Sequence, residues 1–284
     1  MFIIIGIGLI CMRKFVLFAL LAIFILPMAF CVDSLSLIEP GANIVRGQTV
    51  DYGTVGPGQT FTVQMEPNVR NATDNSYLGR WDTAYATSLP DGWTSKPSKI
   101  YDTPLVIEVT VAKDAPEGDY TVPFLVGDEG GLEHLGDNIS FSAIVHVKHD
   151  VMTMSVDPLS METGAGQPAR FSITLSNTGS AKDVYTVNAS GVKGWEFEKK
   201  VYLLPGTSKT ITFEVVGNEE TYYNLIFMAQ SDSSPLIHKE KPVQLNVHTN
   251  LISDYKATSN GVLLFPIMQI PVYSIAGMLG LLFP

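Results

Sequence analysis

Hydrophobic and polar residues alternate along most of the chain from about residue 34 onward. In the first half, every second residue is apolar in four runs, at 61–65, 105–111, 120–126 and 141–147. A period of two is typical of β-strands that bury one face, and little of the chain has the period of a helix. The sequence therefore predicts an all-β fold.

The same series of runs begins again after Asp150. Apolar alternation returns at 171–175, 211–215, 223–229 and 243–247, in the same order as before. The offsets between the two series are nearly constant, which predicts a duplicated domain. The matched pairs are Ile107 with Ile211, Tyr120 with Tyr223, and Ala143 with Leu245, which lie 104, 103 and 102 residues apart.

The turn signals are duplicated as well. Gly58-Gln59 precedes the first series as Gly166-Gln167 precedes the second, and Gly92-Trp93 corresponds to Gly194-Trp195. Each Trp is predicted to fill the space between two sheets, because a large ring after a tight turn is most simply a core residue. Asn177-Thr178-Gly179 is expected to reverse the chain through positive φ angles and a local side-chain hydrogen bond. These motifs are interpreted as turns of a fold, not as a binding site.

Each copy holds about seven short strands in roughly 100–115 residues, the size of an immunoglobulin-like domain. The sequence therefore predicts two tandem immunoglobulin-like β-sandwiches, at 33–149 and 150–250. The junction at 147–151 contains no Gly, Pro or Ser. A strand that runs almost directly into the next domain favours a semi-rigid rod over a flexible tether.

The order of these motifs resembles the NPCBM-associated accessory domains, which occur beside alpha-galactosidases and in tandem on archaeal and bacterial surface proteins. The motifs are Gly-Gln, a strand ending in Asn-x-Gly, Gly-Trp, Pro205-Gly206-Thr207 and Gly118-Asp119-Tyr120. The resemblance covers about 33–249. The second copy departs from it at 219–222, and the first has Asp102-Thr103 in place of Pro-Gly-Thr and an insertion at 67–80. The resemblance implies the fold and says little about function.

Both ends of the chain are apolar. Residues 1–31 have the form of a signal peptide, predicted as a helix, in which Arg13 and Lys14 precede an apolar run and Met12 is the expected start. Residues 261–284 contain no charged residue and are long enough to span a bilayer. A C-terminal membrane anchor is the preferred interpretation, although Pro266 and Pro271 would kink a helix there. A tail that docks on a membrane partner, a processed anchoring signal and ordinary core remain alternatives.

Composition narrows the list of partners. Residues 32–284 carry 16 Lys and Arg against 28 Asp and Glu, a net charge of −12, which repels nucleic acid. Both cysteines, Cys11 and Cys31, lie in the predicted signal peptide. An exported chain that begins at Val32 therefore has neither disulfides nor cysteine metal sites.

Motifs for catalysis and for cofactors are weak. Residues 164–169 fit Gly-x-Gly-x-x-Ala, but a strand follows where a dinucleotide site needs a helix. His146 and His149 are three apart in a predicted strand and cannot share a metal ion. The loop 127–138 holds four carboxylates and is interpreted as a solvated hairpin tip, in preference to a weak calcium site. No enzyme activity, cofactor or metal is predicted.

Two groups of residues remain as candidates for contact with glycans. Tyr77 and Trp81 could stack on sugar rings, although Trp81 shares a predicted strand face with Tyr85 and is more simply a core residue. Asn71, Asn138 and Asn188 lie in Asn-x-Ser/Thr sequons and are permitted glycosylation sites.

The preferred hypothesis is a non-enzymatic cell-envelope protein that is exported and membrane-anchored, with its domains facing the cell exterior. It would serve as a structural spacer or as an adhesion or assembly module, with envelope or membrane proteins as partners. The alternative is a carbohydrate-binding protein or an accessory subunit of a glycan-processing or membrane protein complex.

Overall fold

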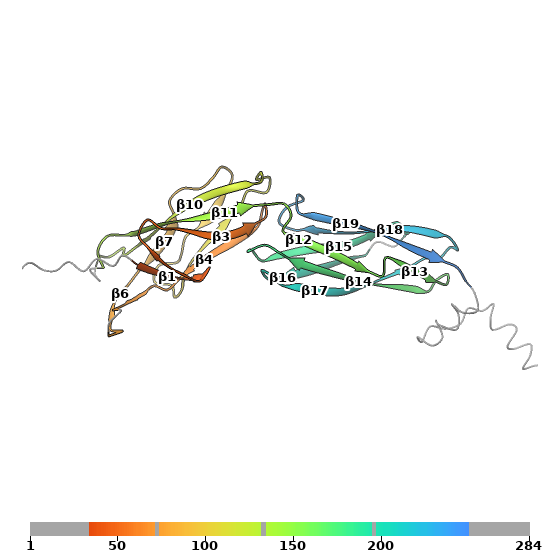
Figure 1. Ribbon diagram of the computed structural model, residues 1–284, viewed down its shortest axis with the longest axis horizontal. Coiled ribbons are helices and arrows are strands. Elements are labelled where there is room, and N and C mark those ends of the chain that lie inside the picture. The colour runs from red at the N-terminus through yellow and green to blue at the C-terminus, as the bar shows by residue number, and fades with distance from the viewer. Residues whose placement is uncertain (1–33, 72–73, 132–134, 195–196, 250–284) are drawn as a thin grey trace, which may run out of the picture.

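A computed structural model describes residues 34–71, 74–131, 135–194 and 197–249. Within these ranges every regular element is a β-strand, and the strands form two sandwich-like units placed end to end (Figure 1). The predicted all-β fold is confirmed. The predicted signal peptide, the predicted membrane anchor and Trp195 lie outside the described residues. In the part of the chain that is described, no helix has the length and hydrophobicity needed to cross a membrane.

The first unit consists of two large sheets and one small one. One large sheet has the order β2-β1-β4-β9-β8, the other has the order β3-β11-β10-β7, and β5 pairs with β6. The strand bounds are β1 (Ser34–Glu39), β2 (Ala42–Val45), β3 (Thr49–Val55), β4 (Thr60–Met65), β5 (Asn68–Arg70), β6 (Tyr77–Arg80), β7 (Thr83–Ala86), β8 (Thr94–Lys96), β9 (Leu105–Thr110), β10 (Gly118–Gly127) and β11 (Ile139–Val147).

The second unit consists of two sheets. Their orders are β12-β14-β17 and β13-β19-β18-β15-β16. The strand bounds are β12 (Met152–Asp157), β13 (Ser160–Thr163), β14 (Pro168–Asn177), β15 (Asp183–Ser190), β16 (Glu198–Leu203), β17 (Ser208–Val216), β18 (Tyr222–Ser231) and β19 (His238–Val247).

The two units share a strand order that supports the predicted duplication. In each unit an early strand pairs in parallel with the last one, β3 with β11 and β13 with β19. Tyr120 lies opposite Val145, and Tyr223 lies opposite Leu245. The equivalent of Leu245 is therefore Val145, two residues from the predicted Ala143. A shift of two residues keeps the same face buried, so the alternation alone could not reveal it.

The predicted apolar runs supply the two cores. Most of their alternating residues are buried, and two separate clusters of buried side chains result, one in each unit. Trp93 is 6% exposed, with ring centroids 6.4 Å from Phe61 and 5.3 Å from Tyr120. The prediction that Trp93 is a core residue is confirmed.

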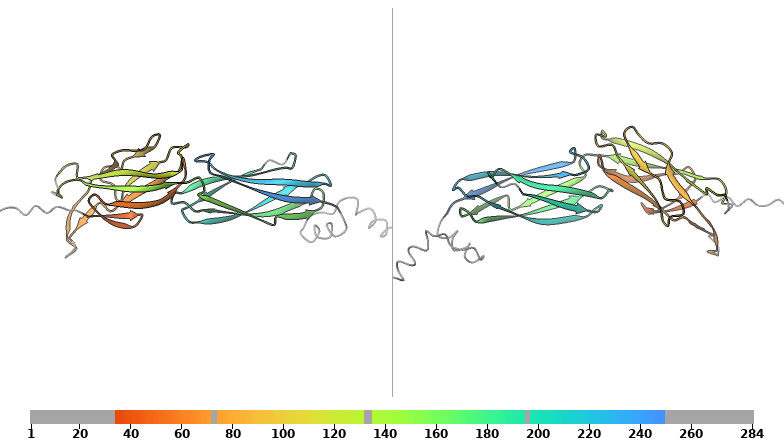
Figure 2. Two further views of the ribbon diagram at one scale, coloured as in Figure 1. Left: turned by 45° about the horizontal axis from the view of Figure 1, so that its top comes forward. Right: turned by 180° about the vertical axis from the view of Figure 1, so that it is seen from behind.

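The predicted insertion at 67–80 is an extra hairpin. Strands β5 and β6 form a sheet of their own that extends away from the first sandwich (Figure 2). The second unit passes from β14 to β15 through a short turn at the corresponding place. The insertion therefore changes the free end of the molecule and leaves the junction between the units as it is.

Candidate functional site

The two units make direct contacts at the junction between them. Strand β11 ends at Val147 and β12 begins at Met152. Between them, Lys148 N donates to Val55 O at 3.2 Å, and Asp150 pairs with Lys239 of the second unit at 2.8 Å. The link is therefore bonded to both units.

A glycine turn of the first unit lies directly against the second. Gly58 has φ +70°, and a Cβ built on it would lie 2.2 Å from Ser233 O. A Cβ built on Gly56 would lie 2.5 Å from Ile237 Cδ1. At position 58 only glycine allows this approach, because a side chain would meet the backbone of Ser233, whereas at position 56 it would meet the end of the Ile237 side chain.

The loop after β14 makes the reciprocal contact from the second unit. Ser180 N donates a hydrogen bond to Thr54 O at 2.7 Å. Ala181, which follows it, is 1% exposed and belongs to the buried cluster of the first unit. The turn at 177–179, which the sequence predicts as a chain reversal without a binding role, therefore also forms part of the contact between the two units.

The structure corrects the expected geometry of this turn. Asn177 Oδ1 accepts from Gly179 N at 3.0 Å, and Asn177 Nδ2 donates to Ala181 O at 2.7 Å, so the predicted side-chain hydrogen bond is confirmed. The predicted positive φ is wrong, because neither Asn177 nor Gly179 adopts it. Gly179 packs closely against the first unit, since a Cβ there would lie 3.2 Å from Thr54 O, which is tighter than ordinary van der Waals contact.

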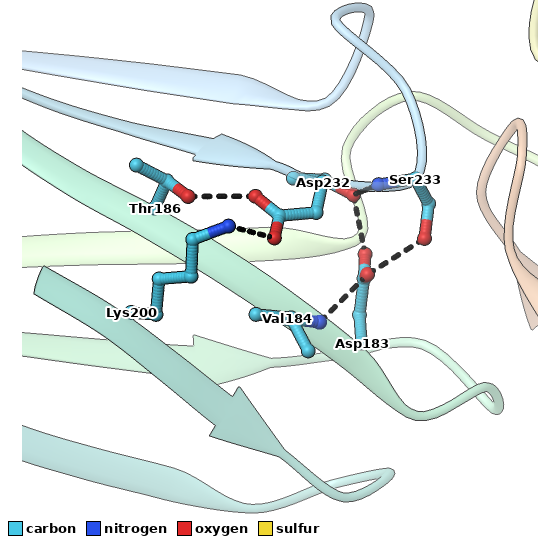
Figure 3. Close-up of polar contacts among 7 residues, drawn as sticks. Asp183, Val184, Thr186, Lys200, Asp232 and Ser233 are labelled. Atoms are coloured by element: carbon cyan, nitrogen blue, oxygen red, sulfur yellow. Dashed lines mark hydrogen bonds and ion pairs between the residues drawn. The ribbon is translucent and has the colours of Figure 1, made fainter.

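A buried carboxylate joins the two units. Asp183 is 4% exposed and accepts hydrogen bonds from both sides of the junction. Figure 3 shows its contacts within the second unit. Gln59 Nε2 of the first unit donates to it at 2.7 Å, and the Ser231 and Ser233 hydroxyls donate at 2.6 and 2.8 Å. Val184 N donates at 2.8 Å. Four donors form hydrogen bonds with the buried carboxylate, so it is stabilised without a cation. The hydrogen bond from Gln59 makes the contact between the two units directional as well as close.

The hydroxyl of Tyr185 lies beneath this network. Its side chain is fully buried, and burial together with the neighbouring Asp183 carboxylate raises the pKa of the phenol. The hydroxyl lies against the Gln59 side chain without a well-formed hydrogen bond. The phenol therefore stays protonated and has a structural role at the junction.

A polar pocket of about 580 Å³ opens beside the junction. Asp232 lies in its wall and accepts from Lys200 Nζ at 2.8 Å and from Thr186 Oγ1 at 2.6 Å (Figure 3). The hydrogen bond from Lys200 is the main reason why the pKa of Asp232 is lowered. The residues that line the pocket are Lys113, Thr186, Asn188, Glu198, Gln230, Ser231, Asp232, Ser233 and Pro235. None is aromatic, so the pocket offers no ring for a sugar.

The two residues predicted to contact glycans lie in different surroundings. Tyr77 is 55% exposed at the start of β6. Trp81 is fully buried in the first core and has no open ring face. Tyr85 is 41% exposed, so the prediction that it shares a face with Trp81 is wrong. The alternation fails because Trp81 and Asp82 are both buried where the chain enters β7.

The three sequons are spread over the molecule. Asn138 is exposed just before β11, whereas Asn71 and Asn188 are half-buried. Asn188 lies in β15 and lines the junction pocket. A glycan on Asn188 would therefore stand beside the contact between the two units.

The histidines do not form a metal site among the described residues. His146 Nδ1 lies 2.6 Å from Asp119 Oδ1, and its Nε2 lies 3.3 Å from Asp51 Oδ1. The hydrogen bond with Asp119 is the main reason why the pKa of His146 is raised. No group of three or more His, Cys, Asp or Glu side chains in the described ranges could hold a metal ion.

Sequence reasoning missed Gln59 and Asp183 as junction residues. The repeated Gly-Gln pair signalled a turn, and the sequence offered no sign that the first copy of this turn meets a second domain. Asp183 could have been noticed as the only acidic residue at 177–185, where the loop leads into a buried strand.

Comparisons with known proteins show no family. No protein-family model matches the chain, and no curated protein matches it. A β-glucosidase from Listeria innocua in complex with glucose is similar with a TM-score of 0.26 and 17% identity, over 35% of this chain. The chain spans 16% of the length of that enzyme.

Two further solved structures are similar over more of the chain. A chimeric titin Z1Z2 with a KLER exogenous peptide from decorin has a TM-score of 0.32 and 12% identity, over 78% of this chain and 100% of that one. A protein of unknown function from Porphyromonas gingivalis W83 has a TM-score of 0.24 and 12% identity, over 69% of this chain and 96% of that one. At these scores the likenesses carry no argument about function.

Proposed function

We propose that this chain is a non-enzymatic cell-envelope protein in which two immunoglobulin-like domains form a semi-rigid spacer outside the membrane. It serves as a structural, adhesion or assembly module for envelope or membrane proteins. The similarity of its motifs to the NPCBM-associated accessory domains belongs to the same proposal. The observation that carries the semi-rigid spacer is the buried contact between Gln59 and Asp183 at the junction.

The immunoglobulin-like assignment is supported by a duplicated tyrosine contact. Tyr120 Oη donates to Pro116 O at 3.0 Å, and Tyr223 Oη donates to Glu219 O at 3.3 Å. Both tyrosines lie near the start of the second-last strand and bond to the backbone four residues upstream. A tyrosine corner of this kind is a hallmark of immunoglobulin-like sandwiches.

The spacer role is supported by the way the two units are held. Domains joined by a linker alone move relative to each other by default. Here the contact is made by backbone groups and by a buried, fully hydrogen-bonded carboxylate. Such groups lose their partners as soon as the units tilt, and an unpaired buried carboxylate is costly.

Export and anchoring are supported by the sequence. Residues 1–31 have the features of a signal peptide, and residues 261–284 have the length and apolar character of a membrane anchor. Fractionation of cells tests this part. We expect the full-length chain to be found with membranes and to resist carbonate extraction, and recovery as a soluble monomer without detergent would contradict the anchor.

The spacer is tested by distance measurements between the units. Spin labels on cysteines placed at Lys96 and Lys209, with Cys11 and Cys31 replaced if present, should give one narrow distance distribution. Gln59→Ala should broaden this distribution, and Gln167→Ala, at the equivalent turn of the second unit, should leave it unchanged. A broad distribution in the parent chain would mean a flexible tether and would remove the basis of the proposal.

A carbohydrate-binding function is the second candidate. It is favoured by two exposed rings on the first unit, Tyr77 at 55% and Tyr101 at 60% exposure. Tyr101 has φ +60°, and its ring centroid lies 5.7 Å from Arg80 Cζ. Glycan-array binding that is lost in Tyr77→Ala or Tyr101→Ala, with the fold intact, would favour this function over the spacer.

A further inference from the structure

The insertion at 67–80 forms one wall of a second pocket, in the first unit. The volume of this pocket is about 300 Å³. Its lining comes from β1, from β2, from the link between β4 and β5, and from the whole of β5. The second unit has only a short turn in place of the insertion, so it lacks this wall.

Backbone pairing fixes the walls of the pocket. Glu66 N donates to Ser36 O at 2.9 Å, which holds the start of the insertion beside β1. Trp81 N donates to Pro67 O at 2.8 Å, which closes the extra hairpin at its base. Strand β1 pairs Ser36 with Asn43 of β2, and both side chains line the pocket. Cross-strand partners on one face lie about 5 Å apart, so these two polar groups are presented together.

A buried donor without a partner borders the same pocket. The Trp81 side chain is fully buried, and its Nε1–H makes no hydrogen bond within the described part of the chain. Trp81 is also one of the residues that line the pocket. A buried N–H without an acceptor is costly, so this indole favours a ligand that brings an acceptor.

Other groups of the lining also have free capacity for hydrogen bonds. Both hydrogen bonds that Glu66 accepts within the described ranges go to its Oε1, from Asn68 N and Nδ2 at 3.2 and 2.6 Å. Its Oε2 therefore remains as a charged acceptor. The Ser36 hydroxyl and the Asn43 amide make no hydrogen bond in the same part of the chain. The pocket thus offers donors and acceptors side by side.

We propose that this pocket binds a neutral sugar through its hydroxyl groups. A metal cation or an ammonium group would bring no acceptor to the Trp81 N–H, and an anion would place its charge against Glu66 Oε2. A sugar hydroxyl both donates and accepts, so it suits the mixed set of groups. Leu35 and Val69 add apolar surface for the C–H groups of the ring. A volume of about 300 Å³ is at the lower end for ligand pockets, which suits a ligand of this size.

The site goes beyond the proposed spacer and differs from the exposed rings of the second candidate function. Neither Tyr77 nor Tyr101 lines the pocket. A sugar bound here would be held by hydrogen bonds, since the Trp81 ring is covered and offers no face for stacking. The inference does not depend on the rigidity of the junction.

Nuclear magnetic resonance of the full-length chain tests the site, with ¹⁵N-labelled tryptophan and a detergent that has no sugar headgroup. The probes are glucose, galactose, mannose and N-acetylglucosamine, each added up to about 100 mM, since so small a ligand binds weakly. The Trp81 indole signal, assigned by its absence in Trp81→Phe, should shift with at least one of them. The Trp93 signal should stay in place, because Trp93 does not line the pocket.

Two variants of the lining test the contacts. Asn43→Ala removes an exposed amide, and Glu66→Gln removes the charge while keeping an acceptor for Asn68. Each should raise the Kd for the sugar about tenfold, because the ligand loses one hydrogen bond. The matched controls are Asn224→Ala, at an exposed position of β18, and Tyr101→Ala, and both should leave the Kd unchanged.

Several results would overturn the proposal. One is a Trp81 signal that none of the four sugars shifts, and another is a shift whose Kd is the same in Asn43→Ala and Glu66→Gln as in the parent chain. Binding that is lost in Tyr101→Ala and kept in Asn43→Ala would place the sugar on the exposed rings instead. The spin-label distances at the junction test the spacer separately, so failure of one proposal is distinguishable from failure of the other.

Discussion

The turn Gly56–Gln59 in the first unit and the turn Gly164–Gln167 in the second have the same backbone and different surroundings. In each, the first glycine N–H donates to the glutamine Oε1, at 2.8 and 3.4 Å, and the glutamine N–H donates back to the glycine carbonyl. Gly58 and Gly166 have φ +70° and +72°. The local sequence thus produces the same turn twice.

What differs is the neighbour of each turn. Gln59 Nε2 extends across the junction to Asp183, and Gly58 touches the backbone of Ser233. The turn of the second unit lies at the opposite end of that unit, where Ala165 N donates to Thr249 Oγ1 at 3.2 Å. The comparison teaches that a motif determines a turn, whereas its place in the molecule determines whether the turn becomes an interface.

Asp183→Ala removes the hydrogen-bond partner of Gln59 and should have the largest effect on stability among the variants that distinguish the two turns. The change leaves Gln59 and two serine hydroxyls without an acceptor in a buried place. We expect a loss of about 4 kcal/mol in the free energy of unfolding of the second unit, measured by urea unfolding.

Asp232→Ala is the matched control for this change. Asp232 also accepts two hydrogen bonds, but its side chain and that of Lys200 are 38% and 60% exposed. Its loss should cost less than about 1 kcal/mol. Equal losses for the two variants would mean that the buried network does not stabilise the junction.

A second comparison uses glycines with the same backbone and different neighbours. Gly58 and Gly47 have φ +70° and +75°, but a Cβ on Gly47 would meet no atom within 4 Å. Alanine at either position should cost about 1–2 kcal/mol for the left-handed backbone. Gly58→Ala should cost about 1–3 kcal/mol more because of the clash with Ser233.

Small-angle scattering provides the second readout for the glycine variants. Gly58→Ala should change the scattering profile, because the units must separate or tilt to admit the methyl group. Gly47→Ala should leave the profile of the parent chain. Identical profiles and midpoints for the two variants would show that the contact at Gly58 is not maintained in solution.

The two tyrosine corners allow a comparison in which the expected effects on stability are smaller and similar in the two units. Tyr120→Phe and Tyr223→Phe each remove one hydrogen bond to a backbone carbonyl. Each change should cost about 1 kcal/mol in its own unit, which two-step urea unfolding can resolve. A cost in only one unit would argue that the corners are not equivalent.

The smallest expected effect is a dependence on pH in the first unit alone. Asp119 and Asp51 face the two ring nitrogens of His146 and raise its pKa. The contribution of His146 is therefore complete below the unfolded pKa of about 6.5 and is lost as the pH rises through the raised folded value. The Tm of the first unit should fall slightly over this window.

His146→Gln is the variant that isolates this effect. It should flatten the Tm of the first unit between pH 6 and 9 and leave that of the second unit as it was. A pH dependence that survives in His146→Gln would have to come from another group.

Much of the fold could be predicted from the sequence because the alternation is a local property. The strands around Phe61, Ile107, Phe171 and Phe213 are where the pattern places them, and each of these side chains is buried. The exact register could not be predicted, as Ala143 and Val145 show, because residues two apart share a face. The alternation also failed at Trp81 and Asp82, where the chain is irregular and both sides are covered.

The junction between the two units could not be predicted from the sequence for a different reason. Gln59 and Asp183 are 124 residues apart in the sequence. Contacts of this kind depend on how the folded sheets and units pack against one another. A local sequence pattern does not predict this packing. Gly58 and Gly179 were predicted as turn residues, although both also lie where the two units approach closely.

The parallel pairing of the last strand in each unit has a mechanical consequence. Strand β19, from which the chain continues toward its C-terminal end, lies between β13 and β18 and is not an edge strand. A pull on its end acts along the strand, so the ladder from Ser160↔Gln244 to Thr163↔Val247 is loaded in shear and its bonds must break together. Strand β11 is held in the same way between β3 and β10. Tension applied between the two ends of the molecule would therefore meet resistance in both units in series before either one unravels.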